Sequence, residues 1–497
     1  MIDGKFKMLL EIGASLSAER DINRLLERIL ACVMELSNCD AGTLYLLEDE
    51  ALHFRIMRND TLHTYSGGDG AGCGLPPVPL TRESVCALAV LDDKVLRIDD
   101  VYHCAEYDLT GPMRYDAMTG YHTQSMAVVP MRNREGGKIG VLQLINAQDA
   151  DGKVVPFDEE IVLVMESVAS QAAITVQNVR YIAQIKELFH SFVRVMSSAV
   201  DARTPYNGSH TRHMVQYGER FLDFLNRRSQ MAGNGPVFDK RHTEEVLMSI
   251  WFHDIGKLVT PLEVMNKMKR LLPEQYANFT HRLEVIRLRG EIDRLSGRVG
   301  GAEQQALLQD VEDAAALVDA VNGAGYLSDG QLEALDALRR RTYRGEDGTE
   351  LPWITPEEYA MLTIRKGTLS DGERAVMEDH VRITDHLLSQ ITFTEEFAHV
   401  RAWASAHHEM LNGSGYPNHL SGEAIPMEVR IISILDIFDA LVADDRPYKP
   451  GMPVERALSI LDIMANKEGK LDPELTRLFI ESKCWESDVP REKQAVL

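Results

Sequence analysis

Hydrophobic positions in the first third of the chain change from a helical spacing to short strand-like runs. Between residues 4 and 37, apolar side chains recur at steps of three and four, which predicts helix. Four short apolar runs then predict strands, and Glu135–Gly137 between the last two predicts a hairpin turn. The runs are Thr43–Leu47, Leu52–Ile56, Met126–Met131 and Ile139–Ile145. The pattern predicts a small mixed α/β domain over residues 18–178.

A long helix is predicted over residues 160–200, leading out of this domain. Its apolar positions alternate steps of three and four over fewer than three heptads, which is the spacing of a coiled-coil seam. These positions are Ile182, Ile185, Phe189, Phe192, Met196 and Ala199. The pattern favours a parallel dimer helix over an ordinary amphipathic helix packed on its own domain.

From residue 200 onward the apolar spacing is helical almost throughout. Residues 268–365 contain predicted helices with faces rich in Glu, Arg, Ala and Leu, as in a helical hairpin or a small bundle. These helices are Leu283–Leu295, Gln304–Val321 and Leu332–Arg340. The expected fold class is multidomain α+β, with a mixed α/β domain, a connecting helix and an all-α region that contains a helical insertion.

Length, charge and cysteine usage narrow the class of protein. A chain of 497 residues is too long for one hydrophobic core, so two or three domains are expected. The net charge of −23 argues against a large nucleic-acid surface, which needs clustered Lys and Arg, but not against a small anionic substrate. No membrane-spanning apolar run and no signal peptide are recognised. The six cysteines are scattered and typical of reduced thiols, so we expect a cytoplasmic location.

The residues best suited to chemistry are histidines and aspartates in the helical region. His253 and Asp254 open a His-Asp-Ile-Gly-Lys run that ends at Lys257, and further candidates lie on either side of it. These are His210, His380, His407, His408 and Asp436, with Gly415, Tyr416 and Pro417 following the paired histidines. Imidazoles and carboxylates in such a set can bind two adjacent metal ions, a device for cleaving phosphodiesters. Asp254 is the expected bridge, because a carboxylate has two oxygens.

The N-terminal third resembles a GAF domain, a family of sensory modules often specific for cyclic nucleotides or other small ligands. The matching segments are Thr119–Met126, Val129–Met131, Gly140–Asn146 and Phe157–Glu160. The resemblance implies a GAF sensory domain with an N-terminal helix over residues 1–178. It leaves the ligand unknown, and a dimerising domain without any ligand is the alternative.

The C-terminal half resembles the HD-GYP proteins, the bacterial branch of the HD hydrolases that degrades cyclic di-GMP. The matching segments are Trp251–Lys257, Leu262–Lys267, Lys366–His380, Ala406–Pro417 and Ile425–Lys449. The resemblance implies an HD-GYP catalytic domain over residues 200–497, interrupted by the helical insertion at 268–365. A lid, a dimer contact and an inert spacer are all open roles for this insertion.

The same resemblance implies two divalent ions, iron or manganese, and a set of ligands for each. One ion would be held by His210, His253, Asp254 and Asp436, and the other by Asp254, His380, His407 and His408. Glu409 and Asp439 are candidates for fixing the tautomers of these imidazoles, although either could be an ordinary ion pair. His213 stands where the family has Arg, and is expected to lie on a helix face rather than bind metal. Tyr206 stands where three-metal relatives carry an acid, which favours two ions.

Substrate contacts are also implied. Lys257 would contact the scissile phosphate or protonate the leaving 3′ oxygen, and is the expected catalytic partner of Asp254. Arg446 and Lys449 would bind substrate phosphate or guanine. Gly415, Tyr416 and Pro417 would shape the rim of the site, the glycine through unusual backbone dihedrals and the proline by fixing the turn.

The expected function is therefore that of a cytoplasmic enzyme, regulated by its GAF domain, that hydrolyses cyclic di-GMP to pGpG or GMP. A homodimer through the GAF domains and connecting helices is expected, with no nucleic-acid or membrane partner. Two alternatives remain. One is a phosphodiesterase for another cyclic dinucleotide such as cyclic GMP-AMP, and the other is a non-catalytic adaptor that reads a nucleotide or recruits a diguanylate cyclase.

Overall fold

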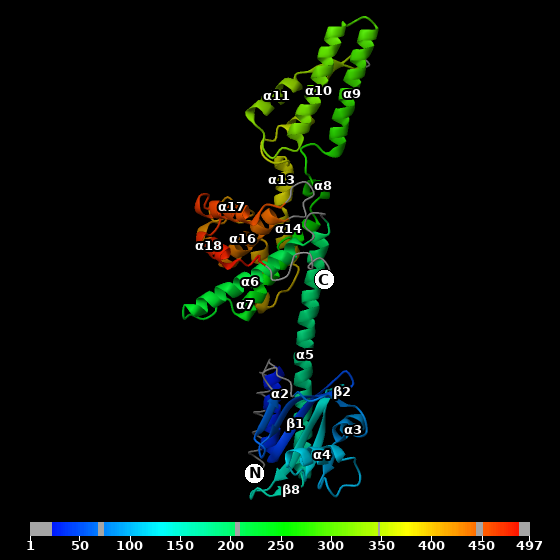
Figure 1. Ribbon diagram of the computed structural model, residues 1–497, viewed down its shortest axis with the longest axis vertical. Coiled ribbons are helices and arrows are strands. Elements are labelled where there is room, and N and C mark those ends of the chain that lie inside the picture. The colour runs from blue at the N-terminus through cyan, green and yellow to red at the C-terminus, as the bar shows by residue number, and fades with distance from the viewer. Residues whose placement is uncertain (1–21, 68–73, 204–208, 346–347, 444–450, 487–497) are drawn as a thin grey trace. The chain divides into compact units, whose positions relative to one another are not determined.

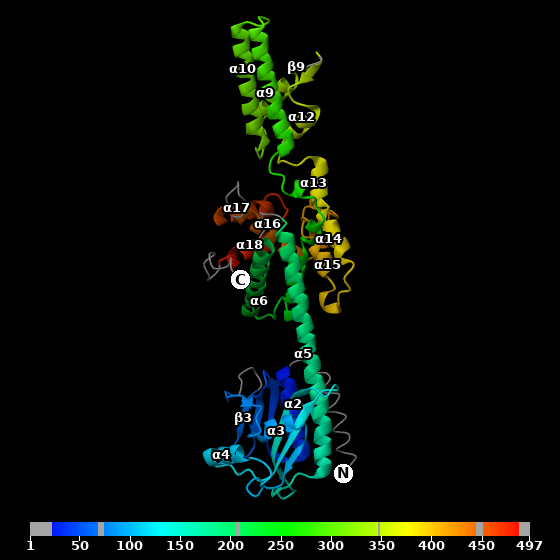
Figure 2. The same ribbon diagram turned by 90° about the vertical axis from the view of Figure 1, so that its right-hand side faces the viewer.

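The computed structural model describes residues 22–67, 74–203, 209–345, 348–443 and 451–486. Contacts between Cα atoms divide the chain into two compact units, Met1–His190 and Ser191–Leu497. Figures 1 and 2 show the two units, which are described one at a time.

The first unit is built on an eight-stranded antiparallel sheet in which the order β3-β2-β1-β7-β6-β5 is extended by β4 beside β2 and β8 beside β7. Its strands are β1 (Cys39–Glu48), β2 (Ala51–Asn59), β3 (Thr64–Gly67), β4 (Val78–Pro79), β5 (Leu96–Ile98), β6 (Met126–Arg132), β7 (Lys138–Gln148) and β8 (Val154–Val155). All four predicted strands are confirmed, and the predicted turn joins β6 to β7. The predicted helix over residues 4–37 is described from residue 22 onward, as α2 (Ile22–Ser37).

Helices cover both faces of this sheet, so that β1 and β7 are buried on both sides. On one face, α2 and the first half of α5 (Glu159–Asp201) pack with residues such as Leu25, Leu44 and Met165 into one core. On the other face, α3 (Val85–Leu91) packs over Val128 and Val141, and α4 (Thr110–Thr119) lies nearby. The mixed α/β class expected from the sequence is confirmed.

The connecting helix, predicted over residues 160–200, is α5, whose 43 residues begin at Glu159 and end at Asp201. Large apolar side chains that are more than half exposed follow one stripe of α5. They are Ile182, Ile185, Leu188, Phe192 and Val195. Of the predicted seam positions, Phe189 and Met196 are half-buried, whereas the neighbouring Leu188 and Val195 are exposed.

The second unit is helical. Its main core joins α6 (His210–Met231), α7 (Lys240–Phe252), α16 (Met427–Val442), α17 (Val454–Asn466) and α18 (Pro473–Ser482). Shorter elements connect these helices. They are η1 (Ile255–Leu258), α8 (Leu262–Met265), α13 (Asp371–Glu378), α14 (His380–Leu388), η2 (Glu395–Phe397), α15 (Val400–Ala404) and η3 (Gly422–Ala424).

The insertion has a core of its own, formed by residues such as Phe279, Leu283, Val318, Leu335 and Trp353. Its helices α9 (Pro273–Leu295) and α10 (Gly301–Asn322) lie side by side, as both views show, followed by α11 (Asp329–Arg339) and α12 (Pro356–Leu362). The three predicted helices are confirmed. The insertion also contains a small hairpin, formed by β9 (Thr342–Arg344) and β10 (Glu350–Pro352).

Candidate metal centre

The centre is organised by the end of helix α7. The last helical residue is Phe252, His253 caps the helix, and Asp254 begins the turn that leads into η1. Both side chains are buried. The Oδ2 atom of Asp254 lies 3.3 Å from Nε2 of His253 and 4.0 Å from Nε2 of His210, the first residue of α6. One oxygen of this carboxylate thus faces two imidazoles.

The other oxygen of Asp254 faces a second set of imidazoles. Its Oδ1 atom lies 3.4 Å from Nε2 of His380 at the start of α14 and 3.9 Å from Nε2 of His407. Four histidines from separate segments of the chain therefore surround one carboxylate, two on each oxygen. This is the arrangement expected of a bridging ligand.

Asp436 on α16 also reaches both sides of the centre. Its Oδ1 atom lies 3.3 Å from Nε2 of His210, and its Oδ2 atom lies 3.8 Å from Nδ1 of His408. The sequence assigned Asp436 to a single ion, together with His210 and His253. Its second contact, to His408, was not predictable because it depends on how α16 packs against the segment that bears the paired histidines.

The donor atoms of the centre suit divalent cations. Within the described residues, two groups have donor atoms within 4.8 Å of one another, His210–His253–Asp254 and His380–His407–His408. Four buried atoms in these groups have no hydrogen-bond partner in the described part of the chain: Nε2 of His253, His380 and His407, and Oδ1 of Asp254. Burying unpaired polar atoms is costly. Their convergence therefore fits a site that cations would satisfy.

The orientation of the imidazoles is fixed by backbone carbonyls. The Nδ1 atoms of His253, His380 and His407 each lie 2.7 Å from the carbonyl oxygen three residues earlier, in Ile250, Met377 and Ala404. Because a carbonyl only accepts, Nδ1 carries the proton and Nε2 presents its lone pair to the centre. This repeated device was missed in the sequence, where only acidic side chains were considered for the role.

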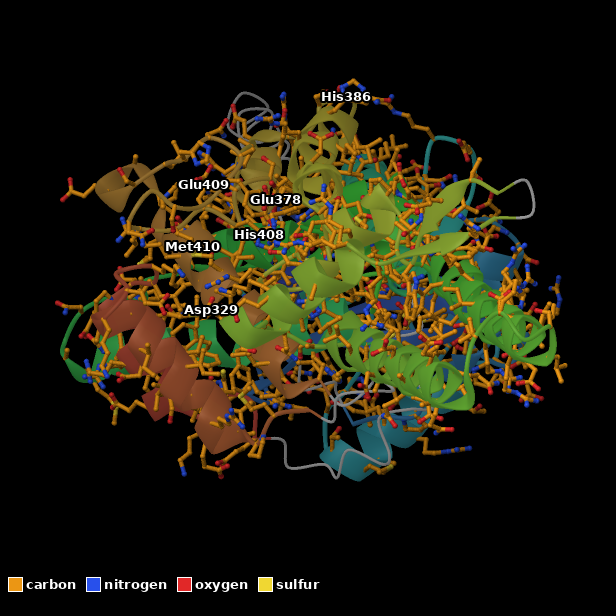
Figure 3. All side chains as sticks on the ribbon, turned by 90° about the horizontal axis from the view of Figure 1, so that it is seen from above. Asp329, Glu378, His386, His408, Glu409 and Met410 are labelled. Atoms are coloured by element: carbon orange, nitrogen blue, oxygen red, sulfur yellow. The ribbon has the colours of Figure 1, made fainter. Side chains whose placement is uncertain are left out.

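Of those two acidic candidates, one is confirmed as a partner of a histidine in the centre. Asp439 Oδ2 lies 2.7 Å from Nδ1 of His210. Glu409 contacts no histidine of the centre, and instead accepts hydrogen bonds from the backbone N–H groups of Asn418 and Leu420. Glu409 follows His408 directly in the chain, and Figure 3 labels both residues. Its two hydrogen bonds hold the loop beyond Pro417.

Burial and neighbouring charges set the protonation of the centre. Burial lowers the pKa of His380 and His407, and lowers that of His408 to about 4, so these imidazoles are neutral. Burial opposes ionisation of Asp254, but His253 and Lys257 hold its pKa well below the usual range. Neutral imidazole and ionised carboxylate are the forms that bind metal.

His210 differs from the other histidines. Burial acts to lower its pKa, but the adjacent carboxylates Asp436 and Asp439 outweigh burial and raise it to about 10. Without a cation, His210 therefore holds a proton between two carboxylates. A bound cation would have to displace that proton.

Lys257 and Gly256 complete the turn after Asp254. The Nζ atom of Lys257 lies 2.5 Å from Oδ2 of Asp254. The backbone of Gly256 packs so closely on α14 that an added Cβ would lie 1.9 Å from the carbonyl oxygen of His380. Thr384 joins the two segments, because its hydroxyl accepts from the N–H of Gly256 and donates to the carbonyl of His253.

The Gly415-Tyr416-Pro417 segment lies beside the second group of histidines. The ring of Tyr416 is 4.8 Å from that of His408, centroid to centroid. The prediction that Gly415 supplies unusual dihedrals is wrong, because its φ is not positive. Glycine is needed for close approach instead, since a Cβ there would lie 2.4 Å from the carbonyl oxygen of His408.

The remaining sequence candidates have different outcomes. His213 is half-exposed, and its Nδ1 lies 3.4 Å from Oδ1 of Asp439, so it shares that carboxylate with His210 and does not face the centre. Arg446, Lys449 and Tyr206 lie outside the described residues.

Comparison with known proteins identifies both domains. The family model described as "HD domain" matches residues 353–475, and the one described as "GAF domain" matches residues 21–176. The chain therefore contains a GAF domain followed by an HD domain. Among the described residues, no helix is both long and apolar enough to cross a bilayer.

Curated relatives are similar to this chain over part of its length. The 3'3'-cGAMP-specific phosphodiesterase 3 of Vibrio cholerae is 37% identical over 22% of this chain and 23% of its own length. The cyclic di-GMP phosphodiesterase response regulator RpfG of Xanthomonas campestris is 44% identical over 20% of this chain and 26% of its own length. The chain thus aligns with about a quarter of each relative. A solved GAF domain from an Acinetobacter phosphoenolpyruvate-protein phosphotransferase, 13% identical, covers 37% of this chain and 98% of its own length, with a TM-score of 0.28.

Proposed function

We propose that this chain is a metal-dependent phosphodiesterase that hydrolyses cyclic di-GMP to pGpG or GMP. The observation that supports this most is the position of Asp254, whose two oxygens face two separate groups of buried imidazoles. The HD domain match and the printed activities of the relatives point in the same direction. On this proposal the catalytic domain spans residues 200–497 and the sensory domain residues 1–178, with the insertion at 268–365.

Two divalent ions, iron or manganese, would occupy the centre. One would be held by His210, His253, Asp254 and Asp436, and the other by Asp254, His380, His407 and His408. When bound, such a pair supplies Lewis acidity toward a phosphoryl group and makes water more acidic. Asp436 has an oxygen near His408 as well, so it would serve both ions or brace the second.

Residues around the centre would bind and orient the substrate. Burial acts to lower the pKa of Lys257, but Asp254 and Asp436 raise it, so Nζ is a charged donor beside the bridging carboxylate. From there it would hold a phosphoryl oxygen or deliver a proton to the leaving 3′ oxygen. The Tyr416 ring beside His408 would limit the approach of the substrate, with Gly415 and Pro417 on the same rim. Arg446 and Lys449 are proposed to contact phosphate or guanine.

The GAF domain would regulate this activity within a cytoplasmic homodimer. The exposed apolar stripe of α5, from Ile182 to Val195, would pair with the same stripe of a second copy. A GAF ligand, still unknown, would act only if it prefers one of two arrangements of α5. A diguanylate cyclase is a further proposed partner.

A second substrate has specific support. The relative from Vibrio cholerae quoted above is named for 3'3'-cGAMP, and its match covers a stretch of similar length to the match with the cyclic di-GMP enzyme. Cyclic GMP-AMP is therefore the alternative substrate for the same reaction.

Turnover and metal content test the proposal together. Protein loaded with iron or manganese should convert cyclic di-GMP to pGpG or GMP, while the Asp254→Ala variant should not. Side-by-side assays with cyclic GMP-AMP decide between the two substrates. If purified protein binds both ions yet produces no more product than Asp254→Ala from either substrate, the proposal fails, and the adaptor role becomes the better account.

A further inference from the structure

The turn that carries Lys257 is held by a side chain from beyond the end of α5. Arg203 lies two residues past Asp201, the last residue of α5. Its Nη1 donates to the carbonyl oxygen of Lys257 at 2.8 Å and to that of Leu258, and its Nη2 donates to the carbonyl of Thr260 at 3.2 Å. One guanidinium thus binds three carbonyls of a segment of four residues.

This arrangement has a clear physical basis. The last carbonyls of a helix have no partner within the helix, and η1 ends at Leu258. A cation placed there satisfies them and interacts favourably with the negative end of the helix dipole. The planar fork of arginine reaches several carbonyls at once, whereas lysine offers a single point charge. Arg203 can therefore bind all three carbonyls, which a lysine at this position could not do equally well.

The opposite side of the same turn is fixed by α14. The N–H of Gly256 is bound by the hydroxyl of Thr384, and the backbone there touches the carbonyl of His380. Between these two supports, the Nζ of Lys257 reaches Oδ2 of Asp254. Loss of either support would allow the backbone at Lys257, and with it the Nζ atom, to move away from Asp254.

A second contact at the end of α5 points to the same region. Asp201 is buried and accepts a hydrogen bond of 3.2 Å from the hydroxyl of Thr211, the residue after His210. The end of α5 therefore touches both the first turn of α6 and the turn that follows Asp254.

We propose that Arg203 is a positioning residue, which fixes residues 255–260 so that Lys257 stays at Asp254. Its effect on turnover rests on the proposed function of the centre, but its effect on the turn does not. Because Arg203 lies only two residues beyond the end of α5, a displacement of the end of this helix would move the Lys257 turn.

The test compares Arg203→Ala, Arg203→Lys and a matched control, Arg227→Ala, in the full-length chain. Arg227 is exposed and pairs with Asp223 on its own helix. Hydrogen exchange followed by mass spectrometry should show faster exchange in peptides covering residues 255–260 for Arg203→Ala, and no change there for Arg227→Ala. Exchange in peptides from α18 should be the same in all variants, which excludes general unfolding.

Activity provides the second readout. In metal-loaded protein, Arg203→Ala should lower kcat by about tenfold or more with unchanged metal content, because small displacements of a catalytic group are costly. Arg203→Lys should recover only part of this loss. In a Lys257→Met background, Arg203→Ala should cause little further loss, since both changes act on one interaction.

Unchanged exchange over residues 255–260 in Arg203→Ala overturns the proposal. The link to Lys257 is overturned if exchange is faster but kcat is not lowered. It is also overturned if the loss of kcat caused by Arg203→Ala adds fully to the loss caused by Lys257→Met. If the wild-type protein binds metal but turns over no cyclic dinucleotide, the proposed function fails, while the exchange comparison still decides whether Arg203 holds the turn.

Discussion

The Nδ1 atom of His210 lies 2.7 Å from Oδ2 of Asp439, and both side chains are buried. The opposite ring nitrogen of His210 lies 3.3 Å from Asp436, so the imidazole connects an outer carboxylate to an inner one. Asp439 thereby fixes the ring of His210 in the orientation that a metal ligand needs. The contribution of Asp439 to metal binding can be measured separately from that of the metal ligands.

Replacing Asp439 by Asn should weaken the binding of divalent metal by about 10- to 100-fold, because partners behind metal-ligating histidines have effects of this size. Titration of metal-free protein with manganese, followed by calorimetry, measures the change. Asp385→Asn is a suitable control, since Asp385 pairs with Arg401 on the surface. Equal affinities for Asp439→Asn and the wild type would show that His210 is oriented without Asp439.

The stability of the metal-free protein should depend on pH through His210. Burial acts against the charged imidazole, but Asp436 and Asp439 raise its pKa to about 10, above the ordinary value of 6.5. A group whose folded pKa is raised contributes stability that is complete below its unfolded pKa and is lost as pH rises through the folded value. The difference in unfolding free energy between wild type and Asp439→Asn should therefore shrink between about pH 7 and pH 10. Urea denaturation in the presence of a chelator measures it, and a constant difference would contradict the assignment.

Much of this fold was predictable, because the apolar spacing of each element reports its burial. The strands β1, β2, β6 and β7 and the helices α9, α10 and α11 of the insertion were placed from spacing alone. The exposure of Leu188 rather than Phe189 on α5 was not predictable, since both residues fit a step of three or four from Ile185. Which of them is covered depends on packing within the folded chain.

The candidate site, like the fold, was predictable in part. Motifs placed the seven candidate ligands in one centre, as the distances around Asp254 and Asp436 now describe. The supports of that centre were not predictable, because they involve backbone carbonyls, such as that of Ile250 for His253, and long-range contacts such as Thr384 to Gly256. Neither kind leaves a pattern in a single sequence. The acidic residue Glu409 looked suitable and proved to hold a loop.

Adding a methyl group at Gly256 should disrupt the centre. Its Cβ would lie 1.9 Å from the carbonyl oxygen of His380, so η1 and α14 would have to move apart, at a cost of about 1–3 kcal/mol or more. Gly330→Ala is the matched control, because nothing lies within 4 Å of a Cβ there and the residue is helical. The control should be neutral or stabilising by about 0.4–1 kcal/mol. Thermal unfolding and metal content of both variants check this, and equal behaviour would contradict the close contact.

Arg270 should be essential to the base of the insertion. Its side chain is fully buried and has no carboxylate partner among the described residues, and it donates to the carbonyls of Val321, Ala324 and Ile364. These lie just inside or beyond the ends of α10 and α12, where carbonyls lack helical partners. The carbonyl of Val321 also accepts from the N–H of Ala324, so replacing Arg270 by Met should leave the carbonyls of Ala324 and Ile364 without their donor. This should destabilise the insertion by about 2 kcal/mol or more, at about 1–3 kcal/mol for each unpaired group. Limited proteolysis within residues 273–362 measures the effect against Arg287→Met, an exposed control paired with Glu284, and equal cleavage of the two variants would refute it.

Charged substitutions on the exposed stripe of α5 should dissociate a dimer. Leu188 and Val195 lie seven residues apart, and each is more than half exposed. In a parallel pair each would meet its counterpart in the second copy, so Leu188→Glu with Val195→Glu would place like charges together in an apolar seam. Light scattering coupled to size exclusion should then report a monomer, whereas Gln184→Glu, an exposed polar position of the same helix, should remain dimeric. A double variant that stays dimeric would show that the dimer interface does not lie on α5. A monomeric wild type would show that there is no such dimer.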